Sequence, residues 1–328
     1  MDVLDRLRLD VPVVQAGMSG RVAGGALAGA VAATGGLGTI GMLPPDHLRS
    51  AISRVRDEAP GRSVAVNLLM PFARRGHVRA CLETDADIVV LAFGGNAALV
   101  RQLHAAGIFV MVMAGTERQV RTAVDWGADA LIAQGRESGG HLMGSVAALD
   151  FLPQARAVAA DRPVFLAGGI ATAADTRTAL AAGAAGVVAG TRFLLTEESG
   201  AHREYQRRVL AARETVETTL FGLGWPARHR VVPNAATRRW CGSDGTARRW
   251  VRALNTGSGV FGRFAPEGAE AVLLRGQRPG WPLFGPAAPL VGMPDSWTDR
   301  AALYAGESAL RITEVVSAKR AVAELAGS

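Results

Sequence analysis

Short apolar segments alternate with longer stretches rich in alanine, leucine and arginine up to about residue 195. The apolar segments contain many β-branched residues and end at glycine, proline or a charged residue, which is typical of buried strands. The longer stretches, among them 95–106, 117–126 and 172–182, have the length and composition of crossover helices. This alternation predicts repeated βα units around a parallel sheet.

The number of apolar segments decides the architecture of that sheet. The segments that qualify as strands are 11–16, 37–41, 63–69, 87–93, 108–114, 129–135, 163–169 and 185–190. Eight parallel strands close into a barrel, and apolar strands suit a barrel that is covered outside by helices and filled inside by side chains. The sequence therefore predicts an α/β fold of the (β/α)8 TIM-barrel class.

The pattern changes after the eighth strand. A charged, helix-like stretch at 201–219 leads into a region rich in glycine, proline, tryptophan and arginine, roughly 221–300, which lacks clean periodicity. Helical spacing returns at 300–326. We expect a barrel over 1–215, an insertion or lid over 216–300, and a C-terminal helix within 301–328 that packs back on the barrel.

Composition narrows the class of protein. No apolar run is long enough to span a membrane, and the N-terminus lacks the layout of a secretory signal, so we expect a soluble, cytoplasmic protein with no membrane partner. The formal net charge of +7 comes from arginine, since Lys319 is the only lysine. The arginines are spread along the chain, although Arg-Arg-Trp occurs at 238–240 and 248–250, and we expect no nucleic-acid partner.

Several kinds of chemistry are disfavoured by what the sequence lacks. A single lysine in the last helix-like segment is poorly placed for a Schiff base at a barrel mouth. Cys81 and Cys241 form no C-x-x-C pair, and no cluster of His, Asp, Glu or Cys has metal-ligand spacing. There is no G-x-S-x-G elbow and no Walker loop, so hydrolase and kinase functions lose support.

One glycine motif is a false match. Gly36, Gly38 and Gly41 satisfy G-x-G-x-x-G, but that fingerprint needs a strand before the glycines and a helix after them. Here a helix-like segment precedes them, so we expect these glycines to end a helix and begin the second strand.

Two other glycine turns predict a phosphate site. The seventh and eighth strands end at Gly168-Gly169 and at Gly190, and each leads into a predicted helix. Glycine lets the backbone approach an anion closely, and barrel enzymes often bind phosphate with these two loops. The alternative is that the glycines only form tight turns between strand and helix.

The loop after the sixth strand carries the strongest candidate for catalysis. Gln134 can donate to and accept from a planar heterocycle, and Gly139 and Gly140 let the main chain lie near a flat ring. His141 follows them, and its near-neutral intrinsic pKa suits proton transfer or stabilisation of an anion. We expect the remaining histidines to be structural or solvated: His47, His77, His104, His202 and His229.

Two further strand ends lie at the predicted active-site face. Met18 follows the first strand and Asn67 ends the third. Taken singly, Met18 is better explained as a core residue and Asn67 as a turn cap.

Taken together, these motifs resemble the nitronate monooxygenase family, formerly called 2-nitropropane dioxygenases, and the related flavin-dependent enoyl-acyl-carrier-protein reductases. The resemblance runs over nearly the whole chain and rests on QAGMSG, GGLGTIG, VNLLMPF, QGRESGGHLMG, LAGGIA, VVAGTRF and LYAGESA. It implies an FMN-dependent oxidoreductase in which His141 is the catalytic residue. The positions that it implies for FMN binding are Gly17, Met18, Ser19, Asn67, Gln134, Gly139, Gly140, Gly168, Gly169, Gly190 and Thr191.

The resemblance also implies a reaction. The first hypothesis is oxidation of an alkyl nitronate, with O2 completing turnover and a homodimer as the assembly. The second is NAD(P)H-dependent reduction of an enoyl thioester or a quinone at the same FMN site. The third is a non-catalytic barrel that binds a phosphorylated ligand. Two departures bear on the choice: several relatives carry a lysine at the end of strand five, where this chain has 111–116 MVMAGT, and Glu307 replaces a glutamine.

Overall fold

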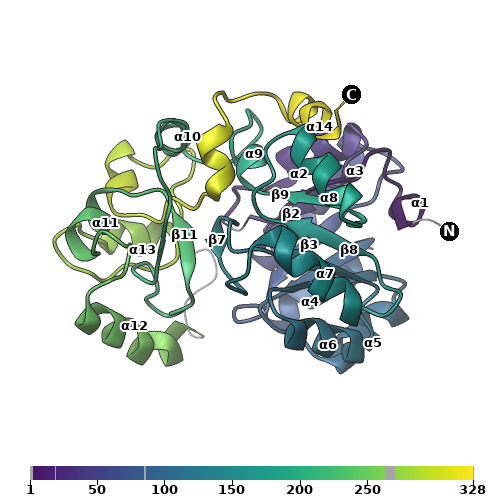
Figure 1. The fold of residues 1–328 in the computed structure, drawn as a ribbon, viewed down its shortest axis with the longest axis horizontal. Helices are drawn as coiled ribbons and strands as arrows, with labels where there is room; N and C mark the ends of the chain where they lie inside the picture. The colour runs from purple at the N-terminus through teal and green to yellow at the C-terminus, as the bar shows by residue number, and fades with distance from the viewer. Residues whose placement is uncertain (1–2, 19, 85, 263–269, 328) are drawn as a thin grey trace.

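An eight-stranded parallel barrel with its helices forms one side of the protein, on the right in Figure 1. The computed structural model describes residues 3–18, 20–84, 86–262 and 270–327. All eight predicted strands are present: β1 Val13–Gln15, β2 Thr39–Ile40, β3 Ala65–Leu69, β4 Ile88–Ala92, β5 Phe109–Ala114, β6 Ala130–Gln134, β8 Val164–Ala167 and β9 Gly186–Ala189. The prediction of a TIM barrel is confirmed.

The barrel closes at a short seam between β1 and β2. Parallel pairing runs in the order β1-β9-β8-β6-β5-β4-β3-β2, and a bridge between Val14 and Leu37 joins the two ends. The fully buried Gln15 reinforces this seam: its Oε1 accepts from Thr39 N at 3.0 Å and its Nε2 donates to Thr39 O at 3.1 Å. A side chain therefore adds hydrogen bonds where β2 is only two residues long.

The strands bury both faces, as the apolar runs predicted. In β4, Ile88 and Val90 point into the barrel core, while Val89 and Leu91 belong to the outer core beneath the helices. The side chains alternate because the strand period is two. The short helix α1 (Val3–Leu7) closes the inner core with Leu7.

The barrel is covered by helices that begin and end where local sequence signals lie. They are α2 Gly25–Ala33, α3 Pro45–Glu58, α4 Arg75–Glu83, α5 Ala97–Ala105, α6 Glu117–Trp126, α7 Ala148–Val158, α8 Ala173–Ala181, α9 Thr191–Leu194 and α14 Ala318–Ala326. Helix α6 is typical: Thr116 caps its first turn, and Gly127 ends it in the left-handed conformation with φ of 91°. Within the described ranges, no helix combines the length and the apolarity needed to cross a membrane.

The G-x-G-x-x-G match has the structural role that its context predicted. Helix α2 ends before Gly36, and β2 begins at Thr39. Gly38 packs against the backbone of α2, since a Cβ there would lie 1.9 Å from Ala28 O. The interpretation of these glycines as a helix end and strand start is confirmed.

The part of the chain from α10 to η1 forms a lobe beside the barrel mouth (Figure 1). Its elements are α10 Arg203–Leu210, β10 Val216–Thr218, β11 His229–Val231, α11 Ala235–Trp240, α12 Arg249–Gly262, α13 Glu270–Gly276 and the 3-10 helix η1 Asp295–Asp299. The lobe has its own apolar core, which includes Leu220, Phe221, Val231 and Phe284. We call residues 216–300 the insertion below.

Two stretches expected to be helical are helical only in part. The 201–219 stretch forms α10 and then strand β10, because its β-branched Val216 and Thr218 pair with β11. The 300–326 stretch forms the 3-10 helix η2 (Glu307–Arg311) and α14, which packs on α8 and α2. The residues before η2 are extended and reach the barrel mouth, so part of this segment helps to build the site.

A second sheet joins the barrel to the insertion. Strand β7 (Gly140–His141) lies in the loop after β6 and pairs antiparallel with β11, so that the sheet has the order β10-β11-β7. This pairing places His141 opposite His229. The sequence predicted only a loop here.

Candidate active site

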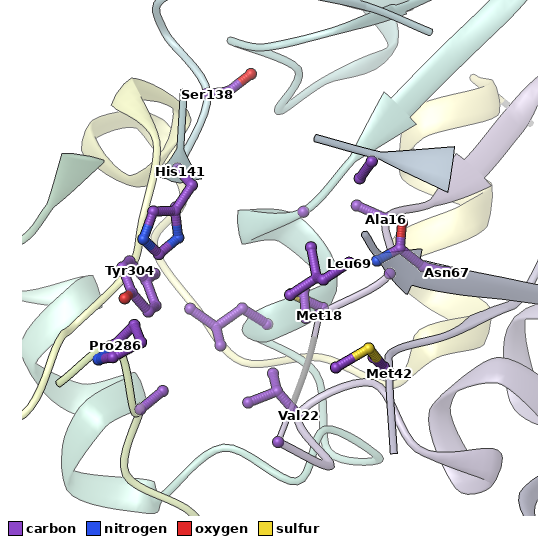
Figure 2. A pocket seen from close by; sticks show the side chains of 18 of the residues that line it. Ala16, Met18, Val22, Met42, Asn67, Leu69, Ser138, His141, Pro286 and Tyr304 are labelled. Carbon is purple, nitrogen blue, oxygen red and sulfur yellow. The ribbon is translucent and has the colours of Figure 1, made fainter. Parts of the chain in front are cut away.

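A cavity of about 470 Å³ opens at the carboxyl ends of the barrel strands and is lined by both the barrel and the insertion. Figure 2 shows its two walls. Met18, Met42, Asn67 and Leu69 lie on one side, whereas His141, Tyr304 and Pro286 lie on the other. Every predicted site residue that the structure describes lines this cavity, and Ser19 lies outside the described residues.

The backbone of His141 is held by the predicted site residue Gln134. The Gln134 amide Nε2 donates to His141 O at 3.0 Å, and its Oε1 accepts from Met143 N at 2.8 Å. On the other edge of β7, Leu142 N donates to Arg228 O at 2.8 Å. Gln134 therefore uses both ends of its amide to shape the loop that carries His141.

The imidazole of His141 projects toward the cavity in an aromatic setting (Figure 2). Trp225 of the insertion stacks on it, with ring centroids 3.7 Å apart and an interplanar angle of 22°. Its Nε2 is buried and contacts no hydrogen-bond partner in the described part of the chain. Burial, together with the neighbouring His229 ring, holds the pKa of His141 well below the usual 6.5, so the ring is neutral at pH 7.

The two glycine turns after β8 and β9 come together at one end of the cavity. Gly168 and Gly169 adopt φ of 117° and 74°, the left-handed region that suits glycine. Among the described residues, no protein acceptor contacts the backbone N–H groups of Gly169, Gly190 and Thr191. These donors are available to an anion.

Two details of the turns limit which groups can bind an anion. The Thr191 hydroxyl accepts from Gly306 N at 2.9 Å, so this side chain already joins η2 to the barrel. The start of α8 is capped by Asp175, whose Oδ2 accepts from Ala171 N at 2.9 Å and Thr172 N at 2.8 Å. The N–H groups of the two residues before α8 are therefore occupied, and Asp175 N donates to Thr172 Oγ1 at 3.4 Å.

Ser138 is a site residue that the sequence did not single out. Its Oγ is buried without a partner within the described ranges, and a Cβ on Gly168 would lie 2.9 Å from it. An unsatisfied buried hydroxyl is costly unless a ligand or water satisfies it. Its place between Gln134 and His141 was the only available signal.

Asn67 lines the cavity from the middle of β3, whereas the sequence placed it at the end of this strand. It is 3% exposed, and no hydrogen-bond partner contacts its amide in the ranges that the structure describes. Gly17 packs on it, since a Cβ at Gly17 would lie 2.3 Å from Asn67 Cβ. Met18 lines the cavity beside them.

Gly139 and Gly140 have different structural roles. A Cβ on Gly139 would lie 2.5 Å from Gly306 N, so the His141 loop and the segment before η2 touch through their backbones. Gly140 has φ of 76° and open space around its missing Cβ. Gly139 thus permits close packing, and Gly140 permits the turn into β7.

Arg230 fixes the His141 loop to the insertion, a role that the sequence did not indicate. Its Nε and Nη2 donate to Arg136 O at 3.0 and 2.8 Å, and Nη2 lies 3.0 Å from Glu217 and 3.2 Å from Glu307. Glu307 is the residue that replaces a glutamine of the resembling family. Here its carboxylate pairs with a buried guanidinium.

The other histidines are structural or solvated, as predicted. His47 is exposed, His77 and His202 cap helices, and His104 pairs with Asp129. His229 is buried, with Nδ1 3.0 Å from Ala227 O, and burial lowers its pKa to about 4. Its ring lies 5.1 Å from that of His141.

One family model matches more than half of the chain. The family model described as nitronate monooxygenase matches residues 3–75 and 54–245. A Mycobacterium tuberculosis protein, named as a dehydrogenase of a hydroxy-methyl-oxo-octahydro-indene-carboxyl-CoA, is 36% identical over 264 residues, which cover 78% of this chain and 72% of that protein.

Two solved structures share the whole fold. FabK from Thermotoga maritima aligns with a TM-score of 0.78 and 28% identity, covering 98% of this chain and 94% of that chain. Nitroalkane oxidase from Streptomyces ansochromogenes aligns with a TM-score of 0.76 and 27% identity, covering 99% and 96%.

Proposed function

This chain belongs to the nitronate monooxygenase family of oxidoreductases, and on that premise we propose that it is FMN-dependent and oxidises alkyl nitronates with O2. The observation that carries the proposal is the place of His141. A neutral imidazole projects into an apolar cavity at the barrel mouth, beside backbone donors that can hold a phosphate. Cofactor and base would then share one cavity.

The residues around the cavity fit FMN. The N–H groups of Gly169, Gly190 and Thr191 and the buried Ser138 hydroxyl would bind its phosphate, because each is a donor that lacks a protein acceptor within the described ranges. The Asn67 amide would hydrogen-bond the ring system or the ribityl chain.

The other predicted positions would act through the backbone. Gly17 and Met18 would lie along the flavin, with Ser19 beside them in the sequence. Gly168 and Gly140 supply turns with positive φ. Gln134 and Gly139 would contribute by shaping the loop that holds His141.

Bound FMN supplies the electron acceptor that passes electrons on to O2. The chain's own contribution is proton handling and orientation. His141 is neutral at pH 7, so it can remove the proton from the carbon next to a nitro group, or hydrogen-bond the oxygens of an anion that is already formed. The apolar walls, which include Phe72, Phe93 and Trp225, exclude water from this step.

A second function is supported by a specific feature of the cavity. Met113, near the end of β5, lines the cavity. The family resemblance implies a lysine at the end of this strand in several relatives, where this chain has 111–116 MVMAGT. Among the described lining residues, the β5 wall offers an anionic substrate no positive charge. The lack of positive charge on this wall and the likeness to a protein named as a CoA dehydrogenase both support an alternative function. That alternative is NAD(P)H-dependent reduction of a thioester, or oxidation of a thioester at the same site.

An anaerobic absorption experiment separates the two functions. Purified protein loaded with FMN is mixed with an alkyl nitronate, and separately with NADH or NADPH. We expect the nitronate to bleach the flavin absorbance. No spectral change with nitronate, together with rapid bleaching by NAD(P)H, would overturn nitronate oxidation and support the alternative.

The role of His141 is tested in the same assay. His141→Asn removes the base and keeps a polar group of similar size. We expect FMN to bind normally and turnover of a neutral nitroalkane to fall by about 10²- to 10⁴-fold. Full activity of this variant would contradict the assignment. A homodimer remains a prediction that gel filtration can test, and the cytoplasmic location remains a separate prediction.

A further inference from the structure

The insertion places one aromatic side chain directly on the imidazole of His141. The Trp225 and His141 rings are stacked, 3.7 Å apart and 22° from parallel. The other rings near His141 meet it at steeper angles: Phe93 at 85°, His229 at 58° and Tyr304 at 48°. Trp225 therefore covers one face of the imidazole.

The barrel holds the indole in this position. Phe72 and Phe93, which follow β3 and β4, meet the Trp225 ring edge-on at centroid distances of 5.2 and 4.9 Å. Such edge-to-face contacts are favourable. Phe93 adopts φ of 62°, a sparsely populated region for an aromatic residue, and such strain gathers at functional sites.

The insertion anchors the same segment from the other side. Asn255 of α12 donates to Thr219 O at 2.8 Å and to Leu220 O at 3.2 Å. Gly224 N donates to Ser258 Oγ, also on α12, at 2.8 Å. The segment before Trp225 is thus fixed to α12, and the stacked geometry is built in.

We propose that Trp225 is a positioning residue for His141: its indole face orients the imidazole over the cavity and stabilises the ring when it takes up a proton. The face of an indole carries partial negative charge and attracts cations more strongly than the other aromatic side chains do. The inference rests on the proposed function only in the step that protonates His141.

The other groups around His141 cannot provide this stabilisation. The titratable side chains that contact the ring are His229 on β11 and Tyr304 before η2. Burial lowers the pKa of His229 to about 4 and raises that of Tyr304, so both are neutral near pH 7. No carboxylate contacts the imidazole within the described part of the chain. Burial alone would oppose protonation, and Trp225 offsets that cost.

A pair of substrates isolates the effect. A neutral nitroalkane must lose its proton to His141, whereas its preformed nitronate has no proton to lose. We expect Trp225→Leu to lower kcat/KM for both substrates, and the loss for the neutral nitroalkane should exceed the loss for the nitronate by about 2- to 30-fold. This is the range that the strength of cation–π interactions implies. Trp225→Phe should show a smaller difference, and exposed Trp250→Phe is the matched control.

Equal losses on both substrates would overturn the stabilising role. A second measurement does not depend on turnover, so it tests the inference separately from the proposed function. It records the NMR signals of the His141 ring protons. In the wild type these signals should be shifted upfield by the indole, and Trp225→Phe or Trp225→Leu should reduce the shift. Unchanged signals would overturn the stacking. If the chain reacts with neither nitro compound but the signals move as expected, the nitronate function fails and the positioning role stands.

Discussion

The side chain of Gln134 and the backbone of His141 form a single unit, joined by a hydrogen bond of 3.0 Å from Gln134 Nε2 to His141 O. The same amide also accepts from Met143 N, so it holds the backbone of the loop on both sides of Leu142. A residue at the end of a barrel strand thus helps to fix the position of the candidate base through the backbone of its loop.

Replacing Gln134 should therefore impair catalysis more than folding. Gln134→Leu keeps the volume and removes both hydrogen bonds, so the imidazole loses its fixed position. We expect kcat/KM to fall by about 10- to 100-fold, the size of effect that misplacement of a catalytic group produces. Steady-state assays with circular dichroism check this. Gln154→Leu on the exposed face of α7 is the control, and a Gln134→Leu enzyme with wild-type kcat/KM would contradict the prediction.

The buried hydroxyl of Ser138 should contribute to FMN binding. Removing a hydrogen bond to a charged group costs about 1.5–3 kcal/mol, so Ser138→Ala should weaken FMN affinity by about 10- to 100-fold. Quenching of flavin fluorescence on binding measures the affinity. Ser145→Ala, at an exposed position in the same loop region, should bind FMN as the wild type does. Equal affinities for all three proteins would remove Ser138 from the phosphate site.

Acid should destabilise the fold through His229. Burial lowers its folded-state pKa to about 4, against 6.5 for an unperturbed histidine. Between those values the unfolded chain binds a proton that the folded chain does not, so the free energy of unfolding falls as pH falls. The full effect is about 3 kcal/mol, present above pH 6.5 and lost by about pH 4.

Urea unfolding at several pH values tests this sign. The wild type should lose stability from pH 7 to pH 5 faster than His229→Gln, in which the titrating group is gone. His141 remains in both proteins, but His229 is one cause of its lowered pKa, so the difference between them reports His229 together with its effect on His141. Parallel pH dependences would show that His229 does not titrate as the structure implies.

The contact between Gly139 and Gly306 should tolerate no side chain. A Cβ on Gly306 would lie 2.5 Å from Glu137 O and 2.8 Å from Gly139 N, both backbone atoms. We expect Gly306→Ala to cost about 1–3 kcal/mol and to lower activity by shifting the His141 loop. Gly257→Ala in α12, where nothing lies within 4 Å, should be neutral or stabilising by up to about 1 kcal/mol. Thermal unfolding distinguishes them, and equal melting temperatures would refute the close contact.

The barrel could be predicted from the sequence because each of its strands can be identified from a few consecutive residues. Each apolar run, such as the one around Val89 and Val90, has its own length, composition and bounding residues. The glycine turns at Gly168 and Gly190 followed from their place after successive strands. The cavity collects these residues together with His141 and Asn67.

The remainder depended on contacts between distant segments. Strand β7 has two residues, too few for any periodicity, and it exists because β11 pairs with it some 90 residues later. Trp225 lies in a region without regular pattern, so its stacking on His141 had no signal in the sequence. Ser138 and Arg230 became visible only when burial and partners were known.

The short strand that bears His141 belongs at once to the barrel loop and to the sheet of the insertion. Exchange of the insertion between lineages by recombination would remove both the pairing partner of that strand and the tryptophan above it. A substitution that displaces β11 would therefore also displace the strand that carries His141.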